Sequence, residues 1–169
     1  MTAVSQLEEA SARADQLITD GLDRDDLALI TEAVAEYSAA LQLAAPGSWK
    51  HAEIAHNMGA ALCLIAQRTG ERQRKFSMLK MAGTYLQTAM EVRTRQAAPE
   101  AWALSQANVA LVHLTRFEFW KDRVDLMVAY IAIEDALEIF DDTANWHWFY
   151  WAKEIQAYLQ SLRARILKL

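Results

Sequence analysis

The sequence predicts an all-α protein of about seven helices that pair as antiparallel hairpins. Apolar residues recur every three or four positions along most of the chain, and no run shows the strict alternation expected of a strand. Only two prolines and five glycines interrupt the 169 residues, which favours long helices with short connections. Similar segments also recur at an interval of about fifty residues, which indicates a helical repeat.

The expected helices follow from this periodicity taken in chain order. Their approximate ranges are 3–21, 27–43, 49–70, 73–95, 99–117, 123–140 and 144–167. Gly21 is placed to end the first helix, and Ser48 is an expected N-cap of the third. Pro99 suits the first turn of the fifth helix. Asp142 or Thr143 is expected to cap the seventh, which would cover the core of the last hairpin.

Composition limits the class of protein. The length fits one domain over residues 1–169 with a continuous core. No apolar run approaches the ~18 residues of a membrane span, and the polar first residues lack a signal-peptide core, so the expected location is the cytoplasm, away from membranes. Cys63 is the only cysteine, which excludes an internal disulfide and a cysteine-based zinc site. The net charge of −5 argues against nucleic acid as the partner.

The repeat is carried by small residues. An alanine, a large residue four positions on, and a second alanine three positions after that occur in three segments, spaced 49 and 47 residues apart. The three copies are Ala33, Tyr37 and Ala40; Ala82, Leu86 and Ala89; and Ala129, Ile133 and Ala136. Small residues at a helix crossing let two backbones approach closely. The sequence therefore predicts equivalent helix contacts at these three places.

This pattern resembles the tetratricopeptide repeat, a helix-turn-helix unit. Asn57, Met58 and Gly59 stand at its Asn-Leu-Gly position, the second alanine copy at its second helix, and Pro99 near its terminal proline. The resemblance covers most of residues 27–160, with a longer period than the usual ~34 residues. It implies a right-handed stack of hairpins whose first helices line a groove that binds a protein segment.

The resemblance also implies which residues line that groove. They are Glu53, His56, Ala60, Cys63, Leu104, Ala107, Leu111, Leu114, Lys153, Gln156 and Gln160. His56 and Ala107 stand where a carboxylate-clamping lysine would be, so a carboxylate clamp is not expected. The leucines in the middle of the set suit an apolar helix or ligand. The alternative is that long helices close the groove and bury these leucines in the core.

A run of aromatic residues near the C-terminus is the second candidate site. It comprises Trp146, Trp148, Phe149, Tyr150 and Trp151, with Trp120 expected to lie close to it. Consecutive aromatic residues on a helix point in different directions, so one buried face cannot hold them all. The run therefore has three explanations: packing within the chain, a protein interface, or a small-molecule pocket.

Catalytic and cofactor chemistry have little support in the sequence. Glu53 and His56 share a helix face, as carboxylate and imidazole do in di-iron bundles, but no second copy of the pair occurs. His56 is two helical turns, about 10 Å, from Cys63, too far for a catalytic Cys–His pair. No glycine loop for phosphate is present. We expect no metal and no cofactor.

The sequence therefore favours a non-catalytic scaffold that binds a protein partner through an apolar groove or the aromatic cluster, with homodimerisation left open. The alternative is a helical small-molecule-binding protein or enzyme with an aromatic-lined pocket. A third reading is a subunit of a larger assembly, whose apolar patches are obligate contacts. The identity of any partner or ligand is not encoded in these patterns.

Overall fold

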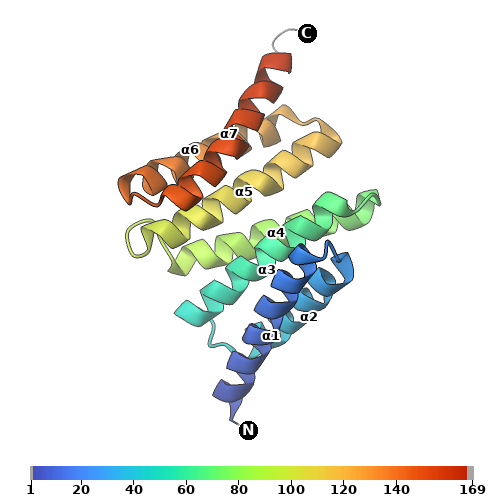
Figure 1. Ribbon diagram of the computed structural model, residues 1–169, viewed down its shortest axis with the longest axis vertical. Helices are drawn as coiled ribbons and strands as arrows, with labels where there is room; N and C mark the ends of the chain where they lie inside the picture. The colour runs from blue at the N-terminus through green and yellow to red at the C-terminus, as the bar shows by residue number, and fades with distance from the viewer. Residues whose placement is uncertain (1, 167–169) are drawn as a thin grey trace. The chain divides into compact units, whose positions relative to one another are not determined.

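Seven α-helices make up the part of the chain, residues 2–166, that the computed structural model describes (Figure 1). They are α1 (Ala3–Asp23), α2 (Leu27–Leu43), α3 (Trp49–Arg68), α4 (Arg72–Val92), α5 (Pro99–Trp120), α6 (Arg123–Asp142) and α7 (Trp146–Ile166). No strand occurs between residues 2 and 166, so the all-α prediction is confirmed. None of the described helices is both long enough and apolar enough to span a membrane.

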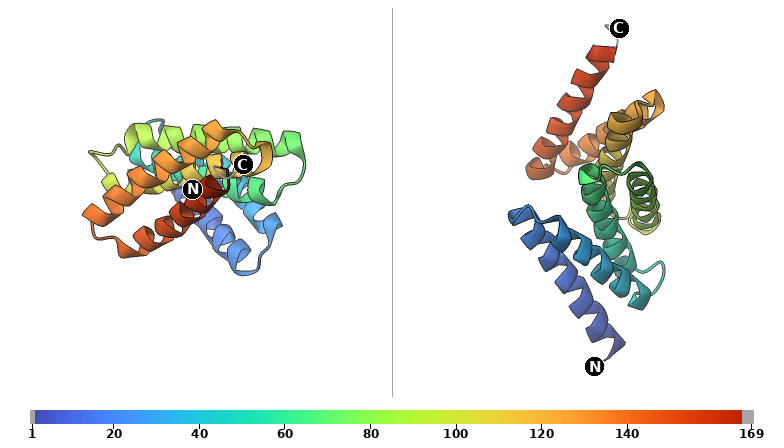
Figure 2. Two further views of the ribbon diagram at one scale, coloured as in Figure 1. Left: turned by 90° about the horizontal axis from the view of Figure 1, so that it is seen from above. Right: turned by 90° about the vertical axis from the view of Figure 1, so that its right-hand side faces the viewer.

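The helices pair in the order that the sequence predicts. The chain divides into two compact units, Met1–Val92 and Arg93–Leu169. In the first unit α1 packs on α2, α3 packs on α4, and α2 contacts α3; in the second, α5 packs on α6 and α7 packs mainly on α6 (Figures 1 and 2). The three hairpins are therefore confirmed, while a single domain over the whole chain stays a prediction.

Side chains at the helix starts explain most of the boundaries. Asp26 caps α2, Ser48 caps α3 and Asp122 caps α6, each by accepting a hydrogen bond from a backbone N–H two or three residues later. Pro99 is the first residue of α5, where its missing N–H leaves no hydrogen bond unmade. These short polar or proline signals are readable directly from the sequence.

Several observed helix ends differ from the expected ones by two or three residues, and two residues expected to mark a boundary have other roles. Gly21 does not end α1, which continues to Asp23. A Cβ on Gly21 would lie 2.7 Å from Cγ1 of Ile30, so this glycine permits α1 and α2 to approach closely. Thr143 does not cap α7 either, because it is the C-cap of α6 and its N–H bonds to the carbonyl of Ile139. In both cases the sequence correctly indicated a residue with a structural role, but the structure gives it a different role from the one predicted.

The alanine repeat is confirmed as a packing motif. Ala33, Ala82 and Ala129 are each 0% exposed, and each lies on the second helix of its hairpin. The large residue and second alanine of every copy are buried as well. Equivalent residues therefore have equivalent burial in all three hairpins, as expected where small side chains let two helices approach.

Gly59 shows how close that approach is in the second hairpin. A Cβ at this position would lie 3.0 Å from the backbone oxygen of Ala82 and 2.9 Å from Cγ of Leu86. The corresponding position on α5 is Ala110, which is fully buried. Glycine on α3 thus allows α4 to pack against the α3 backbone itself.

The final helix covers the core of the second unit. Ile155 and Leu159 of α7 join a buried cluster formed with α5 and α6, and Trp148, Trp151 and Leu162 pack against its margin. The opposite face of α7 is polar and exposed, as the sequence predicts for a terminal helix. Residues 167–169, at the end of the predicted cap, lie outside the described part of the chain.

Candidate functional site

A shallow hollow lies between the first helices of the two hairpins in the first unit. Its volume is about 290 Å³, and we call it the α1–α3 groove. Its walls are formed by α1 and α3, and Tyr37 of α2 contributes to it. The lining residues are Asp15, Ile18, Thr19, Tyr37, Asn57, Ala60, Ala61 and Leu64. Asp15 is the only charged residue among them, so the groove combines apolar walls with one carboxylate.

Three polar side chains from three helices meet in this groove. Oδ1 of Asp15 accepts a hydrogen bond from the Tyr37 hydroxyl at 2.6 Å and another from Nδ2 of Asn57 at 3.2 Å. Tyr37 is only 2% exposed, and its burial, together with the hydrogen bond to Asp15, raises the pKa of the phenol well above its usual value. The cluster therefore fixes the position of the carboxylate on the otherwise exposed face of α1.

We expect Tyr37→Phe to lower the free energy of unfolding at pH 7 by about 1.5 kcal/mol, because it removes a hydrogen bond to a charged group. The raised pKa favours the neutral phenol in the folded state. The stabilisation is therefore present below the unfolded pKa of about 10 and is lost as the pH rises above it. Urea denaturation from pH 7 to pH 11 should show the two proteins converging. The exposed Tyr150→Phe should match the wild type throughout; a constant deficit for Tyr37→Phe would contradict the assignment.

The structure separates the predicted groove residues into different surroundings. Ala60 lines the α1–α3 groove, and Glu53 and His56 lie half-buried on the same helix. Cys63, Ala107 and Leu114 are buried in the interior, which is the alternative the sequence left open. Leu104 and Leu111 pack against the core of the second unit. Lys153, Gln156 and Gln160 lie on the polar side of α7, with Gln156 half-buried and the other two exposed.

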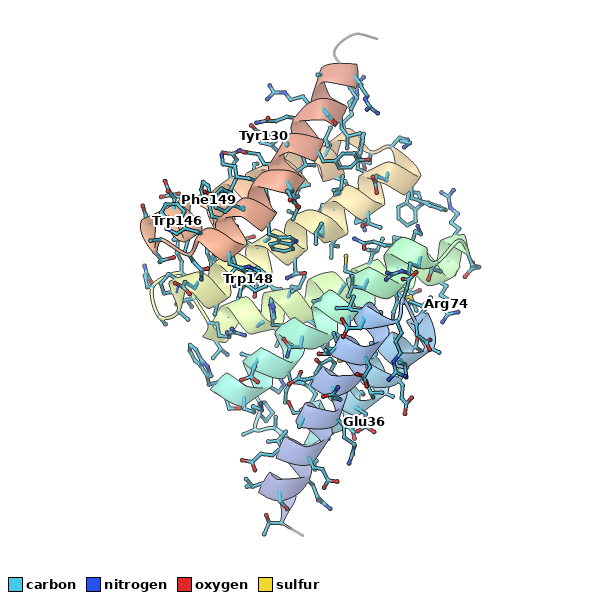
Figure 3. The ribbon with its side chains drawn as sticks, viewed as in Figure 1. Glu36, Arg74, Tyr130, Trp146, Trp148 and Phe149 are labelled. Carbon is cyan, nitrogen blue, oxygen red and sulfur yellow. The ribbon has the colours of Figure 1, made fainter. Side chains whose placement is uncertain are left out.

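The aromatic run is partly core and partly surface. Trp148, Phe149 and Trp151 pack against the core of the second unit, whereas Trp146 and Tyr150 are exposed. Trp146 contacts Phe149 edge to face near the start of α7 (Figure 3). Trp120 is not part of this cluster. It ends α5, whereas the start of α7 lies at the other end of that helix, where Asn145 donates to Glu100.

A second hollow, which the sequence did not predict, lies between α6 and α7. The two helices diverge from their connecting turn (Figure 2), and a cleft of about 320 Å³ lies between the first half of α6 and the second half of α7. Its lining residues are Arg123, Leu126, Met127, Tyr130, Ile131, Leu159 and Arg163. The available signal was that α6 carries apolar residues at Val124, Met127 and Ile131 in addition to its repeat alanines.

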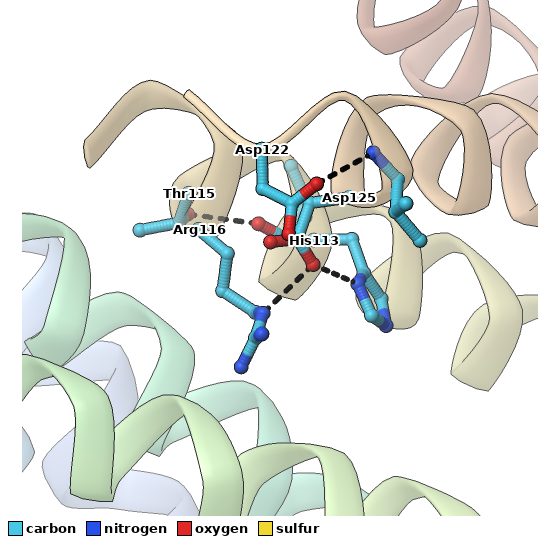
Figure 4. Close-up of polar contacts among 7 residues, drawn as sticks. His113, Thr115, Arg116, Asp122 and Asp125 are labelled. Atoms are coloured by element: carbon cyan, nitrogen blue, oxygen red, sulfur yellow. Dashed lines mark hydrogen bonds and ion pairs between the residues drawn. The ribbon is translucent and has the colours of Figure 1, made fainter. Parts of the chain in front are cut away.

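A buried carboxylate joins α5 and α6 near their turn. Asp125 is 4% exposed, and its Oδ1 lies 2.8 Å from Nε of Arg116 and 2.7 Å from Nδ1 of His113 (Figure 4). The hydroxyl of the neighbouring Thr115 bonds to the carbonyl of Leu111 within α5. Because both partners of Asp125 come from α5, this cluster stabilises the hairpin. None of its three residues lines either of the two hollows described above.

The described residues offer no metal centre. Between residues 2 and 166, no three histidine, cysteine, aspartate or glutamate side chains lie close enough together to hold a metal ion. The two hollows differ in their charge: the first unit offers apolar walls with a carboxylate, and the second offers apolar walls with two guanidinium groups.

Comparison with known proteins shows no family for this chain. No protein-family model matches the sequence, and no curated protein matches it. A solved structure described as "DHF79 filament" is 18% identical with a TM-score of 0.43, covering 96% of this chain and 89% of that one. A likeness at this level assigns neither family nor function.

Proposed function

We propose that this protein is a non-catalytic scaffold of tetratricopeptide-like hairpins that binds a segment of a partner protein. The observation that carries the proposal is the α1–α3 groove. The first helices of two successive hairpins form its walls, which is the arrangement that the tetratricopeptide resemblance implies for a binding groove. Ala60, one of the residues expected to line such a groove, lies in it.

The groove's chemistry suggests what the bound segment carries. Ile18, Ala60 and Leu64 offer an apolar wall, while Asp15 supplies a negative charge held by Tyr37 and Asn57. A partner side chain that is apolar, next to a lysine, an arginine or a free N-terminus, complements both features. The groove is small, so we expect it to recognise a short segment and to gain affinity from contacts further along the hairpins.

Selection from a random peptide library on the purified protein tests this proposal. We expect enriched peptides to combine an apolar residue with a neighbouring basic residue. Asp15→Asn keeps an oxygen that accepts from Tyr37 but removes the charge. It should weaken binding of a selected peptide about tenfold, the equivalent of one charged hydrogen bond.

Glu32→Gln is the matched control, because it removes the same charge from an exposed position on α2 outside the groove. Its affinity should equal that of the wild type. No enrichment, or an equal loss in both variants, would contradict the groove as a peptide site. Native mass spectrometry separates the alternative function, since a retained small molecule would favour a ligand-binding protein.

A further inference from the structure

The outer face of α6 is apolar along its first half. Val124, Met127 and Ile131 are 59%, 58% and 54% exposed, and their spacing of three and four residues places them on one side of the helix. Met127 and Ile131 also line the α6–α7 cleft. The repeat alanines of α6 point the other way, into the hairpin core. Contiguous exposed apolar surface of this kind marks an interaction site.

The charged residues near the two halves of α6 differ in sign. At the first half, Arg123 and Arg163 of α7 border the cleft, and the nearby Asp125 is buried with Arg116 and His113. The helix N-cap Asp122 is the other acidic residue there. The charged residues in the second half of α6 are all acidic, and one of them, Glu138, pairs with Arg95. They are Glu134, Asp135, Glu138, Asp141 and Asp142. The exposed face therefore has a basic end and an acidic end.

A helix with opposite charges at its two ends is complementary to an antiparallel copy of itself. Met127 and Ile131 are symmetric about position 129, and so are Arg123 and Asp135. An antiparallel register that packs Met127 against Ile131 thus also places Arg123 opposite Asp135. A two-fold axis makes each of these contacts twice. A parallel pair would instead place Arg123 opposite Arg123.

We propose that a second copy of this chain docks on the outer face of α6, with the two α6 helices antiparallel about a two-fold axis near position 129. The paired apolar residues form the centre of the contact, and the Arg123–Asp135 pairs border it. This surface shares no residue with the α1–α3 groove, so substitutions that test one surface leave the residues of the other unchanged.

Sedimentation velocity over a concentration series tests the proposal directly. The wild type should pass from monomer to dimer. Ile131→Glu should keep it monomeric at least tenfold higher in concentration, because a carboxylate then faces the apolar centre of the contact. Val4→Glu makes the same kind of change at an equally exposed position on α1 and should dimerise as the wild type does. Circular dichroism confirms that each variant is folded.

A charge exchange tests the register. Arg123→Asp alone and Asp135→Arg alone each place like charges together twice, so each should weaken dimerisation at least tenfold. Mixing the two variants should restore it. In the mixed dimer the two substituted residues pair on one side of the axis and the native Arg123 and Asp135 pair on the other. A wild type that stays monomeric, variants that dimerise normally, or a mixture that stays monomeric would each overturn the proposal.

Discussion

Gly59→Ala should lower the free energy of unfolding by about 2 kcal/mol, within the range found for overpacked cores. The added methyl group would lie 2.9 Å from Cγ of Leu86 and 3.0 Å from the backbone oxygen of Ala82. The leucine is fully buried and has little room to move, and the backbone oxygen cannot yield without shifting α4. Urea denaturation followed by circular dichroism measures the loss.

Gly83→Ala is the matched control, because it makes the same change on the partner helix of the same hairpin. A Cβ at Gly83 meets nothing within 4 Å, so only the helix propensity changes. We expect this variant to be more stable than the wild type by about 0.5–1 kcal/mol. Opposite signs for the two substitutions would show that Gly59 is required for helix approach. If both substitutions stabilised the protein, the close contact at Gly59 would be contradicted.

Asp125→Asn should also lower the free energy of unfolding by about 2 kcal/mol. The carboxylate is almost fully buried, and its Oδ1 contacts both Arg116 and His113. Neutralising it leaves the guanidinium without its counter-charge, and the amide oxygen that replaces Oδ1 accepts hydrogen bonds less strongly than a carboxylate oxygen does. The loss is smaller than for a fully buried pair, because the side chains of His113 and Arg116 are about 30% exposed and water can partly solvate them.

The control for this prediction is Asp122→Asn, three residues earlier. Asp122 caps α6 by accepting from the N–H of Val124, and asparagine is an equally good N-cap. Its stability should stay within about 0.5 kcal/mol of the wild type, as for most surface substitutions. Denaturation in low and high salt compares the two variants. Equal small effects would show that the buried cluster contributes nothing measurable.

Local patterns were sufficient to predict the helices and their pairing. Ser48, Asp122 and Pro99 act within one turn of a helix start, so their effect depends on no distant residue. The buried alanines could be identified because a small residue repeated at one interval indicates a repeated contact. The role of Gly21 was predicted wrongly, because the sequence alone does not distinguish a glycine that ends a helix from a glycine at a helix crossing.

The candidate surfaces were harder to predict, because they depend on how far neighbouring helices diverge. Cys63, Ala107 and Leu114 were assigned to a groove by position in the repeat, yet they are buried. Asp15 carries the charge of the α1–α3 groove, although it lies outside the segment that resembles the family. The α6–α7 cleft depends on the angle between α6 and α7, and neither the hydrophobic periodicity nor the composition of the sequence predicts that angle.

The order of helix contacts has a consequence for how the chain folds. Each helix packs mainly on a helix adjacent to it in the sequence, so bringing the two partners together requires closing only a short connection. Proteins with such local contacts fold quickly, and each hairpin can form before its neighbours are complete. During synthesis, the first pair of helices can therefore bury its alanines while the aromatic start of the last helix has yet to leave the ribosome.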